Sequence, residues 1–104
     1  AASKRGVKVR MMTEKSDYNT ILNKYNTEVA EYIKQGGIEL HYDPPNEITH
    51  AKLVIVDDTV VLGSTNWGFG AMMQYNEANL LLNVSKATNF FRDFFDYLWD
   101  KNIK

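Results

Sequence analysis

Four kinds of polar side chain that can act together on an anionic centre lie within one short stretch of the chain. They are the imidazole of His50, the ammonium of Lys52, the hydroxyl of Ser64 and the carboxamide of Asn66. A neutral imidazole can attack an electrophile without first losing a proton, and the other three groups donate hydrogen bonds. This set suits a nucleophile surrounded by donors for an oxyanion.

Two aliphatic runs, one on each side of a polar turn, must position these side chains. Residues 53–56 and residues 60–62 contain only Leu, Ile and Val, and residues 57–59 between them read Asp-Asp-Thr. Aliphatic and β-branched runs favour strands, and short polar side chains favour a tight turn. We therefore predict two adjacent antiparallel strands.

The alternation of side chains along a strand predicts which residues share a face. His50 and Lys52 point the same way, with Cα atoms about 6–7 Å apart, whereas Asp57 has the opposite parity. Folding the second strand back over the first brings residues 64–66 level with residues 50–52. We expect the polar groups to meet there, and we expect Asp57 to have a structural role in the turn.

These residues also carry a resemblance to a known family. His50-x-Lys52-x4-Asp57 followed by Gly63-Ser64-x-Asn66 resembles the signature of the phospholipase D superfamily, the HKD phosphodiesterases. The resemblance extends to Trp67 and to Asn76-Glu77, and it covers most of the chain, including the strand-like segments "KRGVKVRMM" and "QGGIELHYD". The gap between Asp57 and Gly63 is one residue shorter than is common in the family. That difference shifts the turn and leaves the chemistry in place.

The residue set and the resemblance together predict a mechanism. His50 attacks phosphorus and forms a phosphohistidine, while Lys52 and Asn66 compensate the charge of the phosphate oxygens. The resemblance implies that Glu77 orients a catalytic histidine. The predicted site residues are: catalytic, His50, Lys52, Asn66 and Glu77; substrate-binding, Lys52, Ser64, Asn66 and Trp67; structural, Asp57 and Gly63. No metal ion and no cofactor are expected. Trp67 either stacks on a base or touches a lipid chain, or it holds the loop as a hydrophobic wedge.

The protonation of the leaving group requires a second histidine. In HKD enzymes a second motif supplies it, and this chain has no other His-x-Lys sequence. We therefore expect activity only when two motifs pair, the second coming from a homodimer partner or from a missing part of the same polypeptide. Nucleic acid is the favoured substrate, although the net charge of −1 supplies no attractive field. The alternatives are a phospholipase D or phosphatidyltransferase acting on lipid, and a non-catalytic HKD-like binding module.

The order of predicted elements gives the fold class. A strand in residues 7–12, a helix around residues 21–33, a strand at residues 38–42, the hairpin, a strand from Glu77 and a final helix from Ser85 predict an α/β fold. We expect a mixed β-sheet flanked by helices, a phospholipase D/nuclease-like half-domain. Residues 1–104 are interpreted as a single HKD-type domain of a longer chain, truncated at the N-terminus.

Several features outside the motif limit the possible functions of the chain. The chain has no cysteine, which excludes disulfides and thiolate chemistry. No apolar run approaches the roughly 20 residues of a membrane span, and no signal segment is visible, which favours a cytoplasmic location. His41 and Asp43 could be imagined as metal ligands with His50, but a His and an Asp before a Pro-Pro turn more often make local hydrogen bonds.

Overall fold

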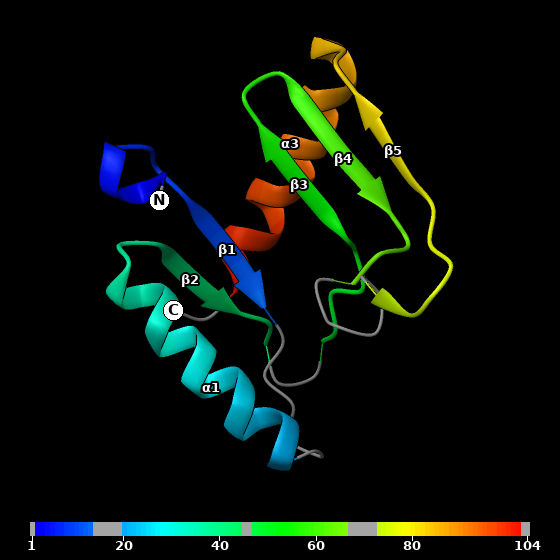
Figure 1. The fold of residues 1–104 in the computed structure, drawn as a ribbon. Helices are drawn as coiled ribbons and strands as arrows, with labels where there is room; N and C mark the ends of the chain where they lie inside the picture. The colour runs from blue at the N-terminus through cyan, green and yellow to red at the C-terminus, as the bar shows by residue number, and fades with distance from the viewer. Residues whose placement is uncertain (1, 14–19, 45–46, 67–72, 103–104) are drawn as a thin grey trace. The chain divides into compact units, whose positions relative to one another are not determined.

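The computed structural model describes residues 2–13, 20–44, 47–66 and 73–102 (Figure 1). Its elements are a 3-10 helix (Ser3–Arg5), β1 (Arg10–Thr13), α1 (Thr20–Gln35), β2 (Glu39–Tyr42), β3 (Leu53–Val56), β4 (Thr59–Gly63), β5 (Asn79–Leu82) and α3 (Ser85–Lys101). This order confirms the predicted α/β class. The chain divides into two compact units, Ala1–Thr49 with Trp99–Lys104, and His50–Leu98.

The first unit contains a β-α-β crossover. Strands β1 and β2 pair in parallel, with Arg10 opposite Glu39 and Thr13 opposite Tyr42. Parallel neighbours need a long connection, which α1 supplies here. Helix α1 ends where the Gly36 N–H bonds the carbonyls of Tyr32 and Ile33, and Gly37 follows at φ 85°. A positive φ at the glycine after a helix satisfies the last carbonyls without a steric cost.

The buried face of α1 differs from the face that the sequence predicts. The periodicity predicts an apolar stripe facing a sheet, made of Ile21, Leu22, Tyr25, Val29, Tyr32 and Ile33. Of those whose side chains the structure describes, Ile33 is half-buried, but Ile21, Tyr25, Val29 and Tyr32 are exposed. The small side chain of Ala30 is buried instead, at 2% exposure. A wide apolar surface on a helix leaves its orientation undecided, and a small residue permits close approach of the backbone.

The second unit is built on the predicted hairpin. Strands β3 and β4 are antiparallel, with Leu53 opposite Leu62 and Val56 opposite Thr59, and β5 adds to the other edge of β4. Asp57 adopts φ 50° in the turn, a left-handed conformation that Asp tolerates better than most residues. Parallel and antiparallel pairing therefore occur in two separate hydrogen-bonded ladders among the described residues.

Helix α3 is tied to the turn of the hairpin within the second unit. The buried Thr88 hydroxyl donates to the Asp58 carbonyl at 2.7 Å, and the Arg92 guanidinium donates to the Asp57 carbonyl. These bonds satisfy turn carbonyls that have no strand partner. The sequence predicts that one wide apolar face of this helix packs in the core, with Phe90, Phe91, Phe94, Phe95, Leu98 and Trp99 on it. Of these residues Leu98 is buried, whereas Phe90 is 69% exposed.

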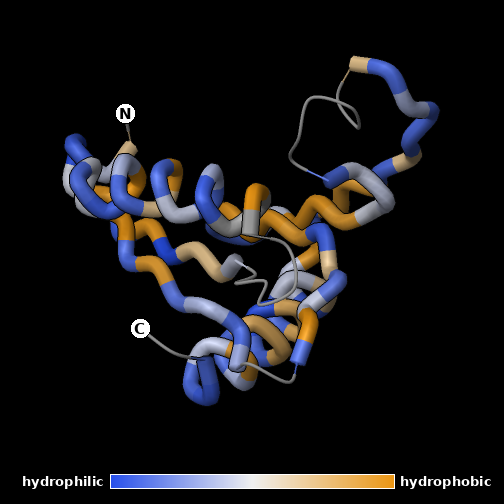
Figure 2. Tube along the Cα trace, turned by 90° about the horizontal axis from the view of Figure 1, so that it is seen from below, coloured by the Kyte–Doolittle hydropathy of each residue, from blue (hydrophilic) through white to orange (hydrophobic). Residues whose placement is uncertain are grey.

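Hydrophobic and hydrophilic residues alternate along the helices, as the tube in Figure 2 shows. This alternation is typical of helices with one face against a sheet and the other toward water. Among the described residues, no helix has both the length and the apolar character needed to cross a bilayer.

Candidate active site

An open hollow of about 210 Å³ lies at the end of the hairpin in the second unit. Its lining residues are His50, Ala51, Lys52, Leu53, Leu62, Gly63, Phe91 and Phe94. Strand β3 begins only at Leu53, so the imidazole and the ammonium belong to the segment just before the strand. The antiparallel register that places Leu53 opposite Leu62 brings this segment beside Gly63. The hollow is smaller than a typical small-molecule pocket of roughly 300–1,000 Å³.

Lys52 is held close to His50 by the backbone. Its ammonium donates a hydrogen bond to the carbonyl of His50 at 2.6 Å, and its side chain is half-buried. An ammonium has three N–H donors, so this bond uses one of them. The ammonium is thereby held at the backbone of His50.

Ser64 is fastened to the segment that leads into β5. Its hydroxyl donates to the Glu77 carboxylate and accepts from the Ala78 N–H at 3.1 Å, while its own N–H donates to the Ala78 carbonyl at 3.1 Å. The sequence predicts that Glu77 orients a histidine. In the described residues the contact of its Oε2 atom is with Ser64. Glu77 thus helps to fix the Gly-Ser-Thr-Asn segment.

Thr65 and Asn79 are joined by two hydrogen bonds, here called a clasp, which the sequence did not predict. The Asn79 amide donates to the Thr65 hydroxyl at 2.7 Å, and the Thr65 N–H donates to Asn79 Oδ1 at 3.4 Å. The sequence feature that could have indicated this contact is the polar Asn79 at the start of an otherwise aliphatic strand. Its significance depends on the register that sets Gly63 opposite Asn79. The clasp restrains the residue directly before Asn66.

Gly63 permits this close approach because it has no side chain. A Cβ at this position would lie 2.3 Å from Asn79 Oδ1, 2.4 Å from the Ala78 carbonyl oxygen and 2.6 Å from Asn79 Cα. Two of these atoms belong to the backbone and cannot rotate away. Any larger residue at 63 must therefore separate the two segments that hold Ser64 and Thr65.

We expect Gly63→Ala to lower the free energy of unfolding by about 1–3 kcal/mol, the usual cost of forcing extra volume into a packed place. Urea unfolding followed by circular dichroism measures this loss. Gly36→Ala is the milder comparison, since its Cβ would come no closer than 3.2 Å to the Ile33 carbonyl. Wild-type stability of Gly63→Ala would contradict the close approach of Gly63 to Asn79.

The remaining motif residues are placed as follows. Asn66 is exposed directly after the clasped Thr65. Asp57 lies in the β3–β4 turn, at the opposite end of the hairpin from the hollow. Trp67 lies outside the described residues, so its two interpretations stay predictions.

His41 and Asp43, the alternative metal ligands, are engaged within the first unit. The His41 ring stacks on Trp99 with centroids 3.4 Å apart, and its Nδ1 lies 3.1 Å from the Trp99 carbonyl oxygen. Asp43 accepts hydrogen bonds from Thr49. Within the ranges that the structure describes, no group of three or more His, Cys, Asp or Glu side chains could hold a metal ion.

Comparison with known proteins identifies the family. A family model described as cardiolipin synthase, PLD-like domain, matches residues 1–99. Mitochondrial cardiolipin hydrolase of Mus musculus is 29% identical over 98 residues, which are 93% of this chain and 42% of that protein. The chain thus spans less than half the length of this relative.

Solved structures agree with this match. The structure described as a phospholipase D family member, Nuc from Salmonella typhimurium, has a TM-score of 0.82 at 31% identity, covering 96% of this chain and 65% of that one. NucT from Helicobacter pylori shares the fold, with a TM-score of 0.74 at 19% identity over 97% of this chain and 67% of that one. The resemblance inferred from the motif is confirmed, and this chain belongs to the PLD-like domain family of the phospholipase D superfamily.

Proposed function

We propose that this chain supplies one half of the active site of a phosphodiesterase that works through a phosphohistidine intermediate. The observation that carries the proposal is the hollow of the second unit, where His50 and Lys52 lie beside Gly63. A phosphodiester is a poor electrophile because its anionic oxygens repel an attacking group. A positive charge near the nucleophile weakens that repulsion.

The first step is an in-line displacement at phosphorus. A ring nitrogen of His50 forms a bond to phosphorus while the bond from phosphorus to the leaving oxygen breaks. Lys52 and Asn66 donate hydrogen bonds to the non-bridging oxygens, and Ser64 keeps the segment bearing Asn66 in place. Glu77 has a second carboxylate oxygen besides the one that accepts from Ser64, and we assign that oxygen to the ring N–H of a catalytic histidine.

The leaving oxygen needs a proton at the same moment. His50 must be neutral to attack, so it cannot also donate this proton, and a histidine of a second motif is the proposed acid. Water, or another alcohol, then attacks the phosphohistidine and releases His50. The second motif belongs either to a second copy of the chain or to another part of a longer polypeptide.

Nucleic acid is the favoured substrate, on the resemblance of Gly-Ser-Thr-Asn-Trp and Asn-Glu to nuclease-type members of the family. Phe91 and Phe94 line the hollow, and aromatic side chains are the kind on which bases of single-stranded nucleic acid stack. Phospholipid is the second candidate. The name of the mouse relative, a cardiolipin hydrolase, and the mostly apolar lining of the hollow both support it.

The full-length protein should be assayed with an aryl phosphodiester, single-stranded DNA, phosphatidylcholine and cardiolipin, each with and without excess EDTA. We expect hydrolysis of the aryl ester and of DNA, at rates that EDTA leaves unchanged. Lys52 and Asn66 supply the charge compensation that a divalent ion supplies in two-metal nucleases.

The alternatives give different results in the same assay. Turnover of the lipids without DNA cleavage would show that the substrate is phospholipid. Loss of activity in EDTA, with recovery on adding Mg²⁺ or Zn²⁺, would contradict the imidazole mechanism. Binding of DNA with no hydrolysis of any of the four substrates would select the non-catalytic module.

A further inference from the structure

The side chain of Asn79 lies against Gly63 and reaches Thr65, all within the second unit. Gly63 and Asn79 are opposite each other in the β4–β5 ladder. Asn79 Oδ1 is the nearest atom that a Cβ at Gly63 would meet, at 2.3 Å. The carboxamide therefore occupies the space that the missing side chain leaves. From there it reaches Thr65, the diagonal neighbour two residues along, as long side chains in a sheet can do.

The clasp holds Thr65 at two points. The shorter bond, from the Asn79 amide to the Thr65 hydroxyl at 2.7 Å, fixes the side chain, and the bond from the Thr65 N–H to Oδ1 at 3.4 Å acts on the backbone. A carboxamide carries a donor and an acceptor, so it can serve both groups. Both bonds are exposed to water, which can replace them, so their loss should cost little stability.

Strand β4 ends at Gly63, so the residues that follow need other partners. The Ser64 N–H still bonds the Ala78 carbonyl at 3.1 Å, and the Ser64 hydroxyl accepts from the Ala78 N–H. At Thr65 the side chain of Asn79 takes over this role. Two consecutive residues directly before Asn66 are thus held by the segment that contains the start of β5.

We propose that Asn79 is a positioning residue for Asn66 and acts through Thr65. The proposal rests on the proposed function, in which Asn66 donates to a non-bridging phosphate oxygen. Thr65 is bonded covalently to Asn66, so restraint of Thr65 limits the directions in which the chain enters Asn66. A donor fixed in advance loses no energy to reorganisation during the reaction, and a displacement of about 1 Å can cost roughly 100-fold in rate.

The test begins with Asn79→Ala in the full-length protein. We expect kcat for an aryl phosphodiester to fall about 10-fold, because Asn66 is misplaced but still present, with KM within about twofold. Thr65→Val, which loses only the hydroxyl bond, should show a smaller fall in kcat. Thr65→Ser, which keeps the hydroxyl, should retain the wild-type kcat.

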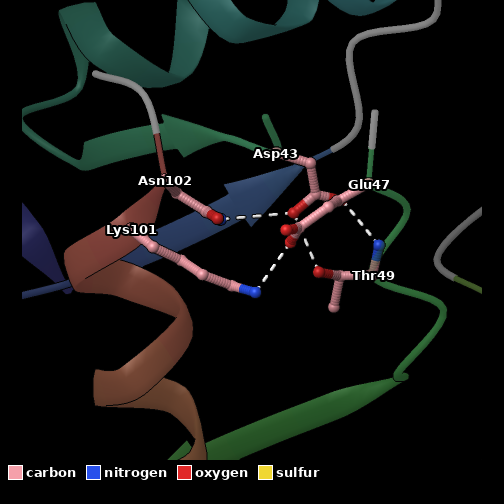
Figure 3. A network of polar contacts seen from close by, with 5 residues as sticks. All are labelled: Asp43, Glu47, Thr49, Lys101 and Asn102. Atoms are coloured by element: carbon pink, nitrogen blue, oxygen red, sulfur yellow. Dashed lines mark hydrogen bonds and ion pairs between the residues drawn. The ribbon is translucent and has the colours of Figure 1, made fainter. Parts of the chain in front are cut away.

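An exposed ion pair of the first unit provides the control. Lys101 and Glu47 lie 2.7 Å apart, with side chains 34% and 50% exposed (Figure 3). Exposed pairs of this kind contribute little to stability. Glu47→Gln should therefore keep the wild-type kcat and KM.

A double-mutant cycle separates positioning of Asn66 from a general loosening of the site. In an Asn66→Ala background the donor is already gone, so adding Asn79→Ala should change kcat by less than about twofold. In a Lys52→Arg background, which keeps the positive charge, Asn79→Ala should still lower kcat by its full factor.

Two results would overturn the proposal. One is wild-type kcat in the folded fraction of Asn79→Ala, and the other is an equal fall in kcat in both backgrounds. Full activity of Asn66→Ala would instead overturn the role of Asn66 in the proposed function, so the two failures are distinguishable.

Discussion

Replacement of His50 by Asn is expected to abolish phosphodiester hydrolysis while the fold is retained. His50 is exposed and precedes β3, so its loss removes no core contact and no strand pairing. Asparagine cannot form the covalent bond to phosphorus, and removal of a nucleophile typically costs about 10³-fold or more in kcat. Rapid quenching of the wild type with a labelled phosphodiester should trap an acid-labile phosphoryl adduct that is missing from His50→Asn.

The other histidine of the chain provides the matched control. His41 is buried at 5% exposure and stacks on Trp99, so His41→Gln should lower stability yet still form the adduct. Lys52→Ala should also reduce turnover strongly, because the phosphate charge is then uncompensated. Wild-type turnover by His50→Asn, or an adduct that maps to Ser64, would show that the nucleophile is assigned incorrectly.

The second expected result is that activity appears only when two motifs meet. One imidazole cannot be neutral for attack and protonated for the leaving group in the same step. His41 is not accompanied by a lysine at the motif spacing, and it already contacts the Trp99 carbonyl. If a second copy supplies the motif, specific activity should fall on dilution as the pairs dissociate, in step with the mass measured by sedimentation.

Mixing experiments separate the two sources of the second motif. An excess of His50→Asn should suppress the wild type, because mixed pairs hold only one His50, whereas an excess of Glu47→Gln should not. If the second motif lies elsewhere in a longer polypeptide, the 104-residue chain should be inactive until that part is added. A strictly monomeric 104-residue chain, hydrolysing phosphodiesters at a concentration-independent specific activity, would contradict pairing.

Local pattern was enough to predict which elements occur and where the motif lies, although β1 begins at Arg10 rather than at residue 7 and β5 begins at Asn79 rather than at Glu77. The aliphatic runs on either side of Asp57-Asp58 predict the β3–β4 hairpin, and the glycines after residue 35 predict the end of α1. These features depend on the period of side chains along one strand or helix and on the turn residues between them. The family resemblance depends on the same kind of information, since the motif residues keep fixed spacings along the chain.

Contacts between distant segments were decided only by the tertiary structure. Ser64 meets Glu77, and Thr65 meets Asn79, because β5 pairs with β4 in one particular register. Shifting that register by one residue would reverse every side chain of the strand, and no local pattern specifies it.

The tertiary structure alone also determined which residues are buried. Ala30 of α1 is buried, whereas the larger Ile21, Tyr25, Val29 and Tyr32 are exposed. Asp43, which in the sequence is one polar residue before a Pro-Pro turn, is the buried partner of Thr49. Periodicity along α1 shows that the helix has an apolar side, but only the packing of the chain around it determines which residues lose contact with water.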